Sequence, residues 1–175
     1  EGDWSNGAFW LCAAALGRPV KVTGLESGSL QGDKAVLSVL ENFGNPIRGF
    51  DVDAKDIPDL VPVLSVVASV AKGRSVFYGA ARLRLKESDR LESTAKMLKA
   101  LGASVKVNTD GLEITGAALH SGTVDACNDH RIAMSAAVAS AVAGDVIING
   151  AEAVNKSYPG FWDDFKALGG RVEQI

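Results

Sequence analysis

The segment LVPVLSVVASVAKGRSVFYGAARLRLKESDRLESTAKMLKALG, residues 60–102, shows the plan on which the whole chain is built. Its first part, up to Gly73, is apolar on nearly every side, which predicts a helix that is buried all round. RSVFYG then predicts a short strand, and 87–102 predict a second helix. That second helix is amphipathic, because apolar residues recur every three or four positions from Leu91 onward and lysines occupy the other face.

Two further segments, one before and one after this unit, repeat the order of apolar helix, strand and second helix. Their strands are predicted over PVKVTG (19–24) and DVIING (145–150). Extended segments follow the second helix in the first two units: FDVDAK (50–55), and a predicted hairpin over 104–116 with an Asp-Gly turn. Glycine ends the corresponding elements in all three units, as expected for left-handed stops: Gly17, Gly73 and Gly144 after the first helices, Gly24, Gly79 and Gly150 after the strands, and Gly44, Gly102 and Gly169 after the second helices.

Repetition of this kind predicts one α+β domain over 1–175, built from three repeated βαβαββ-type units at roughly 3–56, 57–126 and 127–175. Three inner parallel helices are expected at the centre, with mixed sheets outside. The third unit lacks trailing strands, which we expect to come from the opposite end of a longer chain. The chain begins at Glu1 without a Met or a signal-like stretch, so we expect it to be an excised piece.

Composition excludes several classes of function. The net charge is −3 and the sequence pI is about 5.4, whereas proteins that bind nucleic acid usually carry a basic surplus. No apolar run is long enough to predict a membrane span. The two cysteines lie far apart and match no metal-binding spacing, so no metal site is predicted.

Two charged clusters stand at helix starts. RLRLKESDRL (82–91) precedes an apolar helical repeat, and NDHR (128–131) opens a helix that is otherwise almost wholly apolar. Charges at the first turn of a buried helix are costly unless they are paired, so the clusters suggest a site for an anionic ligand. The inner helices start near Asp3, Asp59 and Asp129. If they run parallel, their positive ends converge on one face and favour an anion there.

Each charged residue also has a simpler interpretation when it is considered alone. Asp59 could only cap its helix, Glu87 and Arg90 could form a solvated helix start, and Lys156 could be an ordinary loop lysine. His130 is harder to explain in this way, since the helix after it is nearly all apolar. Because every cluster stands at an equivalent end of a repeat, the joint pattern favours a functional site.

The motifs together resemble the 5-enolpyruvylshikimate-3-phosphate synthase family of enolpyruvyl transferases. The pair KESDR and NDHR is the most specific, and the related enzymes that act on UDP-N-acetylglucosamine lack it, so that family is the second candidate. The resemblance implies two similar domains of three repeats each, with the active site in the cleft between them. This chain resembles the C-terminal domain. The matching motifs are EGDWSNGAFW (1–10), DIPDL (56–60), RLKESDRL (84–91), NDHRIAM (128–134) and KSYPGFWDDF (156–165).

The resemblance implies transfer of the enolpyruvyl group of phosphoenolpyruvate (PEP) to shikimate 3-phosphate, with release of phosphate, in the shikimate pathway to chorismate and the aromatic amino acids. Among the residues expected to be catalytic, Asp59 contacts the 5-hydroxyl and acts as general base, with Lys86 near that hydroxyl. Glu87 is the proton-transfer partner at the PEP methylene, and His130 lies beside the reacting centre.

Four residues are expected to bind substrate. By resemblance, Arg90 and Arg131 hold the PEP carboxylate, for which guanidinium groups are suited, and Lys156 meets the PEP phosphate. Asp129 is the fourth residue expected to bind substrate. No cofactor is implied, and the expected partners are PEP, shikimate 3-phosphate and the missing N-terminal domain. A cytoplasmic location is expected, and the chain alone is expected to be inactive.

A different class of function stays open at this stage. An isolated domain of three repeats could be a non-catalytic module that binds an anion or a partner, or an RNA-associated domain of related architecture. The acidic pI argues against RNA. The retained acids and arginines argue against a module without activity.

Overall fold

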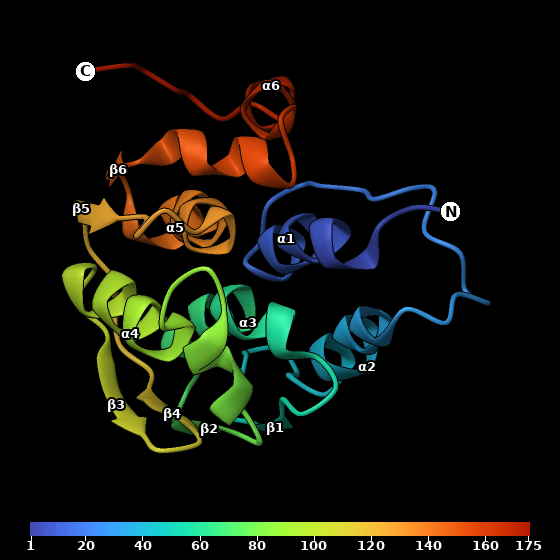
Figure 1. Ribbon diagram of the computed structural model, residues 1–175, viewed down its shortest axis with the longest axis vertical. Coiled ribbons are helices and arrows are strands. Elements are labelled where there is room, and N and C mark those ends of the chain that lie inside the picture. The colour runs from blue at the N-terminus through green and yellow to red at the C-terminus, as the bar shows by residue number, and fades with distance from the viewer.

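Three helices form the centre of the computed structural model, which describes residues 1–175 (Figure 1). They are α1 (Trp4–Ala15), α3 (Val61–Ser69) and α5 (His130–Ala143), and each contacts the other two. Every residue of α3 is buried, and α5 is buried over most of its length. The apolar character predicted for the inner helices is thus explained, because together they supply much of a single hydrophobic core.

The outer elements cover these helices on several sides. The second helices are α2 (Val36–Glu41), α4 (Arg90–Ala100) and α6 (Phe161–Ala167). Short 3₁₀ turns precede several helices: η1 (Gly32–Ala35), η2 (Pro58–Leu60), η3 (Ala81–Leu85) and η4 (Ala151–Lys156). The helix α4 is buried on one face through Leu91, Ala95 and Leu98, as its apolar periodicity predicted.

Two small sheets flank the helices. The larger has the order β1-β2-β4-β3, with β1 parallel to β2 and the other pairs antiparallel. The second sheet pairs β5 with β6 in parallel. The strands are β1 (Asp51–Asp53), β2 (Arg74–Tyr78), β3 (Ser104–Asn108), β4 (Gly111–Thr115), β5 (Gly122–Asp125) and β6 (Val146–Asn149). The strands predicted at 74–79 and 145–150 and the hairpin predicted at 104–116 are therefore confirmed.

The nine glycines predicted to stop helices and strands all adopt the left-handed backbone, with φ between 69° and 106°. An L side chain rarely adopts that conformation, so glycine is the residue that allows the chain to turn at each of these points. The regular punctuation visible in the sequence therefore has a direct backbone cause.

The first unit departs from the predicted plan. Residues 19–24 were predicted as a strand but form none, because no other strand of the chain lies beside them to complete a ladder. The first unit also has no hairpin after α2: the chain turns from Gly44 to β1 through too few residues for two strands and a turn. No helix of the structure has the length and apolarity required to cross a bilayer.

Candidate active site

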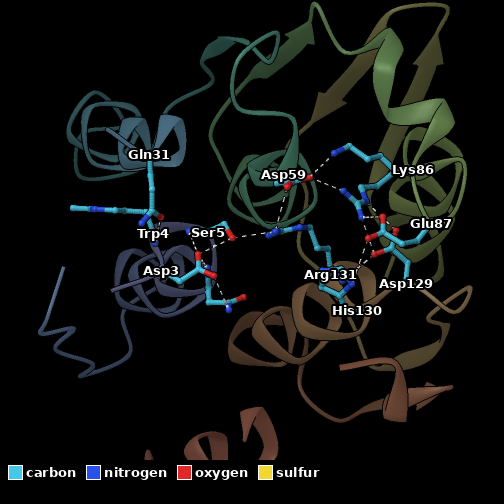
Figure 2. Close-up of polar contacts among 12 residues, drawn as sticks. Asp3, Trp4, Ser5, Gln31, Asp59, Lys86, Glu87, Asp129, His130 and Arg131 are labelled. Atoms are coloured by element: carbon cyan, nitrogen blue, oxygen red, sulfur yellow. Dashed lines mark hydrogen bonds and ion pairs between the residues drawn. The ribbon is translucent and has the colours of Figure 1, made fainter. Parts of the chain in front are cut away.

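The N-terminal ends of the three inner helices meet at Arg131, the second residue of α5 (Figure 2). Its Nη2 donates a hydrogen bond to Ser5 Oγ at 3.0 Å and lies 3.3 Å from Asp59 Oδ2. Ser5 belongs to the first turn of α1, and Asp59 lies in η2, the turn that leads directly into α3. The convergence predicted from the sequence is therefore present, and it joins residues more than 120 positions apart.

The aspartates at these helix starts differ in what they do. Asp3 caps α1, since its Oδ1 accepts hydrogen bonds from the backbone N–H groups of Ser5 and Asn6 at 2.8 and 3.2 Å. Asp129 caps α5 in the same way, accepting from Arg131 N at 2.9 Å. Asp59 makes no capping hydrogen bond, so the simple interpretation of this residue as an N-cap is wrong. Its carboxylate is available for other contacts.

Arg90 is the hub of a buried ion-pair network, with only 1% of its side chain exposed. Its Nε lies 2.8 Å from Asp129 Oδ2 and its Nη2 lies 3.2 Å from Asp129 Oδ1, so the pair is bidentate. Its Nη1 donates to Asp59 Oδ1 at 2.7 Å, and its Nη2 also contacts the Glu87 carboxylate. Ser88 Oγ donates to Asp129 Oδ2 at 3.0 Å. Every nitrogen of this guanidinium thus faces a carboxylate, and the charge is neutralised inside the protein.

Asp59 is surrounded by three cations, Arg90, Arg131 and Lys86, whose Nζ lies 3.3 Å from Asp59 Oδ1. Burial by itself would raise the pKa of Asp59, but these cations outweigh it and hold the pKa below its usual value. Asp59 is therefore ionised at neutral pH. An ionised carboxylate at this position can accept a hydrogen bond from a ligand hydroxyl and take its proton.

Glu87 and His130 form the other side of the cluster. His130 Nδ1 lies 3.8 Å from Glu87 Oε1, and it is buried without a hydrogen-bond partner. Burial, together with the charge of Arg131, lowers the pKa of His130 below its usual value, so the ring is neutral at pH 7. A neutral imidazole beside a carboxylate can donate or accept one hydrogen bond as a ligand requires.

Lys156 forms none of these ion pairs. Its Nζ donates to the backbone oxygen of Asn128 at 2.7 Å and to its Oδ1 at 2.6 Å. Cys127 and Asn128 both have positive φ, so the turn before α5 is strained and Lys156 fastens it to the end of η4. Like Nδ1 of His130, Nη1 of Arg131 is buried with no hydrogen-bond partner.

A cavity of about 410 Å³ opens beside this network. Ser5 and Asp59, which both contact Arg131, line this cavity. Arg82, to which the sequence assigned no role, also lines it. Apart from Pro58 and Gly32 its lining residues are polar or charged, so it is a site for a polar ligand. Its lining consists of Ser5, Gln31, Gly32, Asp33, Lys55, Asp56, Pro58, Asp59 and Arg82.

The sequence analysis assigned no site role to several of these lining residues. Gln31, Gly32 and Asp33 lie where the second helix of the first unit begins, and Lys55 belongs to the extended segment 50–55. The available signal was the position of LQGD immediately before a helix, equivalent to that of KESDR before α4. No group of three or more His, Cys, Asp or Glu side chains is arranged to hold a metal ion.

Several known proteins are similar to this chain over nearly its whole length. A family model described as EPSP synthase (3-phosphoshikimate 1-carboxyvinyltransferase) matches residues 1–165. The 3-phosphoshikimate 1-carboxyvinyltransferases of Clostridium acetobutylicum and Clostridium kluyveri are 46% and 44% identical to it, each over 99% of this chain. The chain spans 44% and 45% of the length of these two relatives, respectively. A solved structure of EPSP synthase from Acinetobacter baumannii matches with a TM-score of 0.79 and 25% identity, over 94% of this chain and 45% of that one.

Proposed function

Since this chain belongs to the EPSP synthase (3-phosphoshikimate 1-carboxyvinyltransferase) family, we propose that it is the C-terminal half of an enzyme that joins PEP to shikimate 3-phosphate. In this reaction the 5-hydroxyl of the shikimate adds to C2 of PEP, the methylene takes a proton, and loss of that proton with departure of phosphate restores the double bond. The chain spans less than half of its curated relatives, so the second wall of the cleft would come from the other half.

The observation that carries this proposal is the meeting of three helix starts at Asp59, Arg90 and Arg131. Asp59 would bind the 5-hydroxyl and act as its general base, since it lines the polar cavity, and Lys86, whose Nζ lies 3.3 Å from Asp59 Oδ1, would stand near the same hydroxyl. Glu87 would pass a proton to and from the PEP methylene, with His130 beside it. A positioned acid or base of this kind is worth about 10²–10⁴-fold in rate.

The anionic groups of PEP would be bound by the cations of the same cluster. Arg131 would hold the carboxylate, since its Nη1 is the donor that the protein itself leaves without a partner. Arg90 would share that carboxylate by exchanging one of its three carboxylate partners for the ligand, and Asp129 would keep it oriented. Lys156 would meet the phosphate from the turn at Asn128.

Arg131→Lys is expected to raise the KM for PEP by about tenfold in the full-length enzyme, with a smaller effect on kcat. The lysine ammonium is a single point charge, whereas the Arg131 guanidinium contacts Ser5 and Asp59 and still has one donor without a partner. Steady-state kinetics with PEP as the varied substrate would measure this. An unchanged KM would remove Arg131 from the carboxylate site.

The 175-residue chain alone is expected to show no synthase turnover, because closure of two domains has to assemble the site and exclude water. Phosphate release from PEP and shikimate 3-phosphate would be measured with the purified chain and with the full-length enzyme. Turnover by the chain alone would mean that its site is complete or is formed by two copies.

The function itself is tested by acceptor choice in the full-length enzyme. Phosphate release is expected with shikimate 3-phosphate and not with UDP-N-acetylglucosamine, which the second candidate family would use. Calorimetric titration with PEP would detect a module that only binds an anion, because such a module would release heat on binding without any turnover. Turnover with UDP-N-acetylglucosamine, or PEP binding without any turnover, would overturn the proposal if it were found in place of shikimate-dependent turnover.

A further inference from the structure

Two contacts of different kinds hold the guanidinium of Arg131 in place (Figure 2). Its Nη2 donates a hydrogen bond to Ser5 Oγ at 3.0 Å and lies 3.3 Å from Asp59 Oδ2. The contact with Asp59 is an ion pair without a hydrogen bond, so Ser5 accepts the one hydrogen bond that this side chain makes. Because a guanidinium is planar and rigid, fixing the direction of one nitrogen also fixes the others. Ser5 therefore sets the direction of Nη1, the buried nitrogen of Arg131 that has no partner.

Ser5 is itself held in place by the cap of its helix. It lies in the first turn of α1, and its Oγ donates a hydrogen bond to Asp3 Oδ1 at 2.9 Å. The same oxygen of Asp3 accepts hydrogen bonds from the backbone N–H groups of Ser5 and Asn6, so the acceptor cannot move freely. With its proton directed to Asp3, the hydroxyl turns a lone pair toward Arg131. The charge of the carboxylate also polarises the hydroxyl and makes its oxygen a stronger acceptor.

The result is a chain of hydrogen bonds from Asp3 through Ser5 to Arg131. It joins the first turn of α1 to the first turn of α5, and its last bond spans 126 positions of sequence. Ser5 lines the polar cavity together with Asp59, whereas only 7% of the Arg131 side chain is exposed. Without the Ser5 hydroxyl, Asp59 is the one acceptor left to Nη2. The guanidinium would then turn toward Asp59 and carry Nη1 away from its present direction.

We propose that Ser5 is a positioning residue, whose hydroxyl aims the Arg131 guanidinium at the carboxylate of PEP. The inference rests on the function proposed above, in which Arg131 holds that carboxylate. Ser5 takes no part in making or breaking bonds, because its proton is bound to Asp3 and its oxygen accepts from Arg131. Its effect on the reaction therefore passes through Arg131 and is an effect on the binding of PEP.

Ser5→Ala in the full-length enzyme is expected to raise the KM for PEP by about fivefold to tenfold, the loss typical of one hydrogen bond to a charged group. The kcat and the KM for shikimate 3-phosphate should change much less, a split that a general loss of stability would not produce. The cap of α1 should survive, since both backbone N–H groups stay bound to Asp3. Steady-state kinetics with each substrate varied in turn would measure these values.

Two further variants serve as controls. Ser5→Thr keeps the hydroxyl and should keep a KM for PEP near the wild-type value. Ser38→Ala removes an exposed hydroxyl near the start of α2, which donates to the backbone oxygen of Ala35 at 2.9 Å, and it should leave all the kinetic constants unchanged. A threonine variant with the same defect as the alanine variant would show that the hydroxyl is not what matters, and would overturn the inference.

A double-mutant cycle tests whether Ser5 acts through Arg131. Arg131→Ala removes the guanidinium, so adding Ser5→Ala to it should lower kcat/KM for PEP no further. If the two losses multiply instead, Ser5 acts independently of Arg131 and the inference is wrong.

The wild-type enzyme separates this inference from the proposed function. If wild type turns over shikimate 3-phosphate and Ser5→Ala keeps the wild-type KM for PEP, the positioning role is refuted and the function stands. If wild type shows no turnover with shikimate 3-phosphate, the proposed function fails and this inference fails with it.

Discussion

Asp129→Ala is expected to lower the free energy of unfolding by about 3–5 kcal/mol, the cost of removing one partner from a buried ion pair. The Asp129 side chain is fully buried and binds Arg90 through both oxygens at 2.8 and 3.2 Å. Its loss leaves Nε of Arg90 without a partner inside the protein and also removes the cap of α5. Urea denaturation of the chain, followed by circular dichroism, would measure the change.

Asp89→Ala is the matched control, since it also removes a capping aspartate paired with an arginine. Asp89 caps α4 and lies 2.8 Å from Arg84, but 38% of its side chain is exposed. Its loss should cost only about 0.5–2 kcal/mol, because water can replace much of what is lost. Equal losses of stability in the two variants would contradict the view that burial makes the Arg90–Asp129 pair important for the stability of the fold.

The contribution of Asp129 should also depend on pH. Burial alone would raise the pKa of Asp129, but the hydrogen bond and charge of Arg90 lower it overall. A carboxylate with a lowered pKa in the folded state contributes stability above its unfolded pKa of about 3.9 and loses it as the pH falls further. The difference in stability between wild type and Asp129→Ala should therefore narrow below about pH 4.

Asp59→Asn is expected to lower kcat of the full-length enzyme by ~10³-fold, the loss typical when a fixed charge is removed from an active site. Asparagine keeps the shape but leaves Arg90, Arg131 and Lys86 without the carboxylate on which all three converge.

Asp53→Asn provides the comparison for Asp59→Asn, because Asp53 is exposed, lies on β1 and forms no ion pair. It should leave kcat near the wild-type value. A loss of kcat confined to Asp59→Asn would support Asp59 as the general base, as the resemblance suggested. A near-normal kcat would exclude Asp59 from the reaction altogether.

The features that could be predicted from sequence depend on neighbours along the chain. Glycine stops, the starts of inner helices near Asp3 and Asp129, and the buried face of α4 follow from local spacing, and the structure confirms them. A strand depends on a distant partner, and the PVKVTG pattern carries no information about whether one is present. That is why the strand predicted at 19–24 is wrong while the one at 74–79 is confirmed.

Within the site, the residues were easier to predict than their pairings. The sequence predicted one site for five residues, and the structure places them in one network: Asp59, Glu87, Arg90, Asp129 and Arg131. It could not show that three carboxylates would neutralise Arg90, because the choice of partner is made in three dimensions. Asp33 was assigned no role although it lines the cavity, because the packing of its loop brings it there and no motif encodes that packing.

The mainly polar lining of the 410 Å³ cavity has a consequence for inhibitor chemistry. A competing compound gains little there from apolar substituents, because Pro58 is the one aliphatic side chain in the lining. Its affinity has to come from hydroxyl, carboxylate or phosphonate groups matched one by one to Ser5, Gln31, Asp33, Lys55 and Arg82. Screening collections rich in flat aromatic molecules should therefore yield few hits at this cavity, and small, strongly charged sugar-like compounds should yield more.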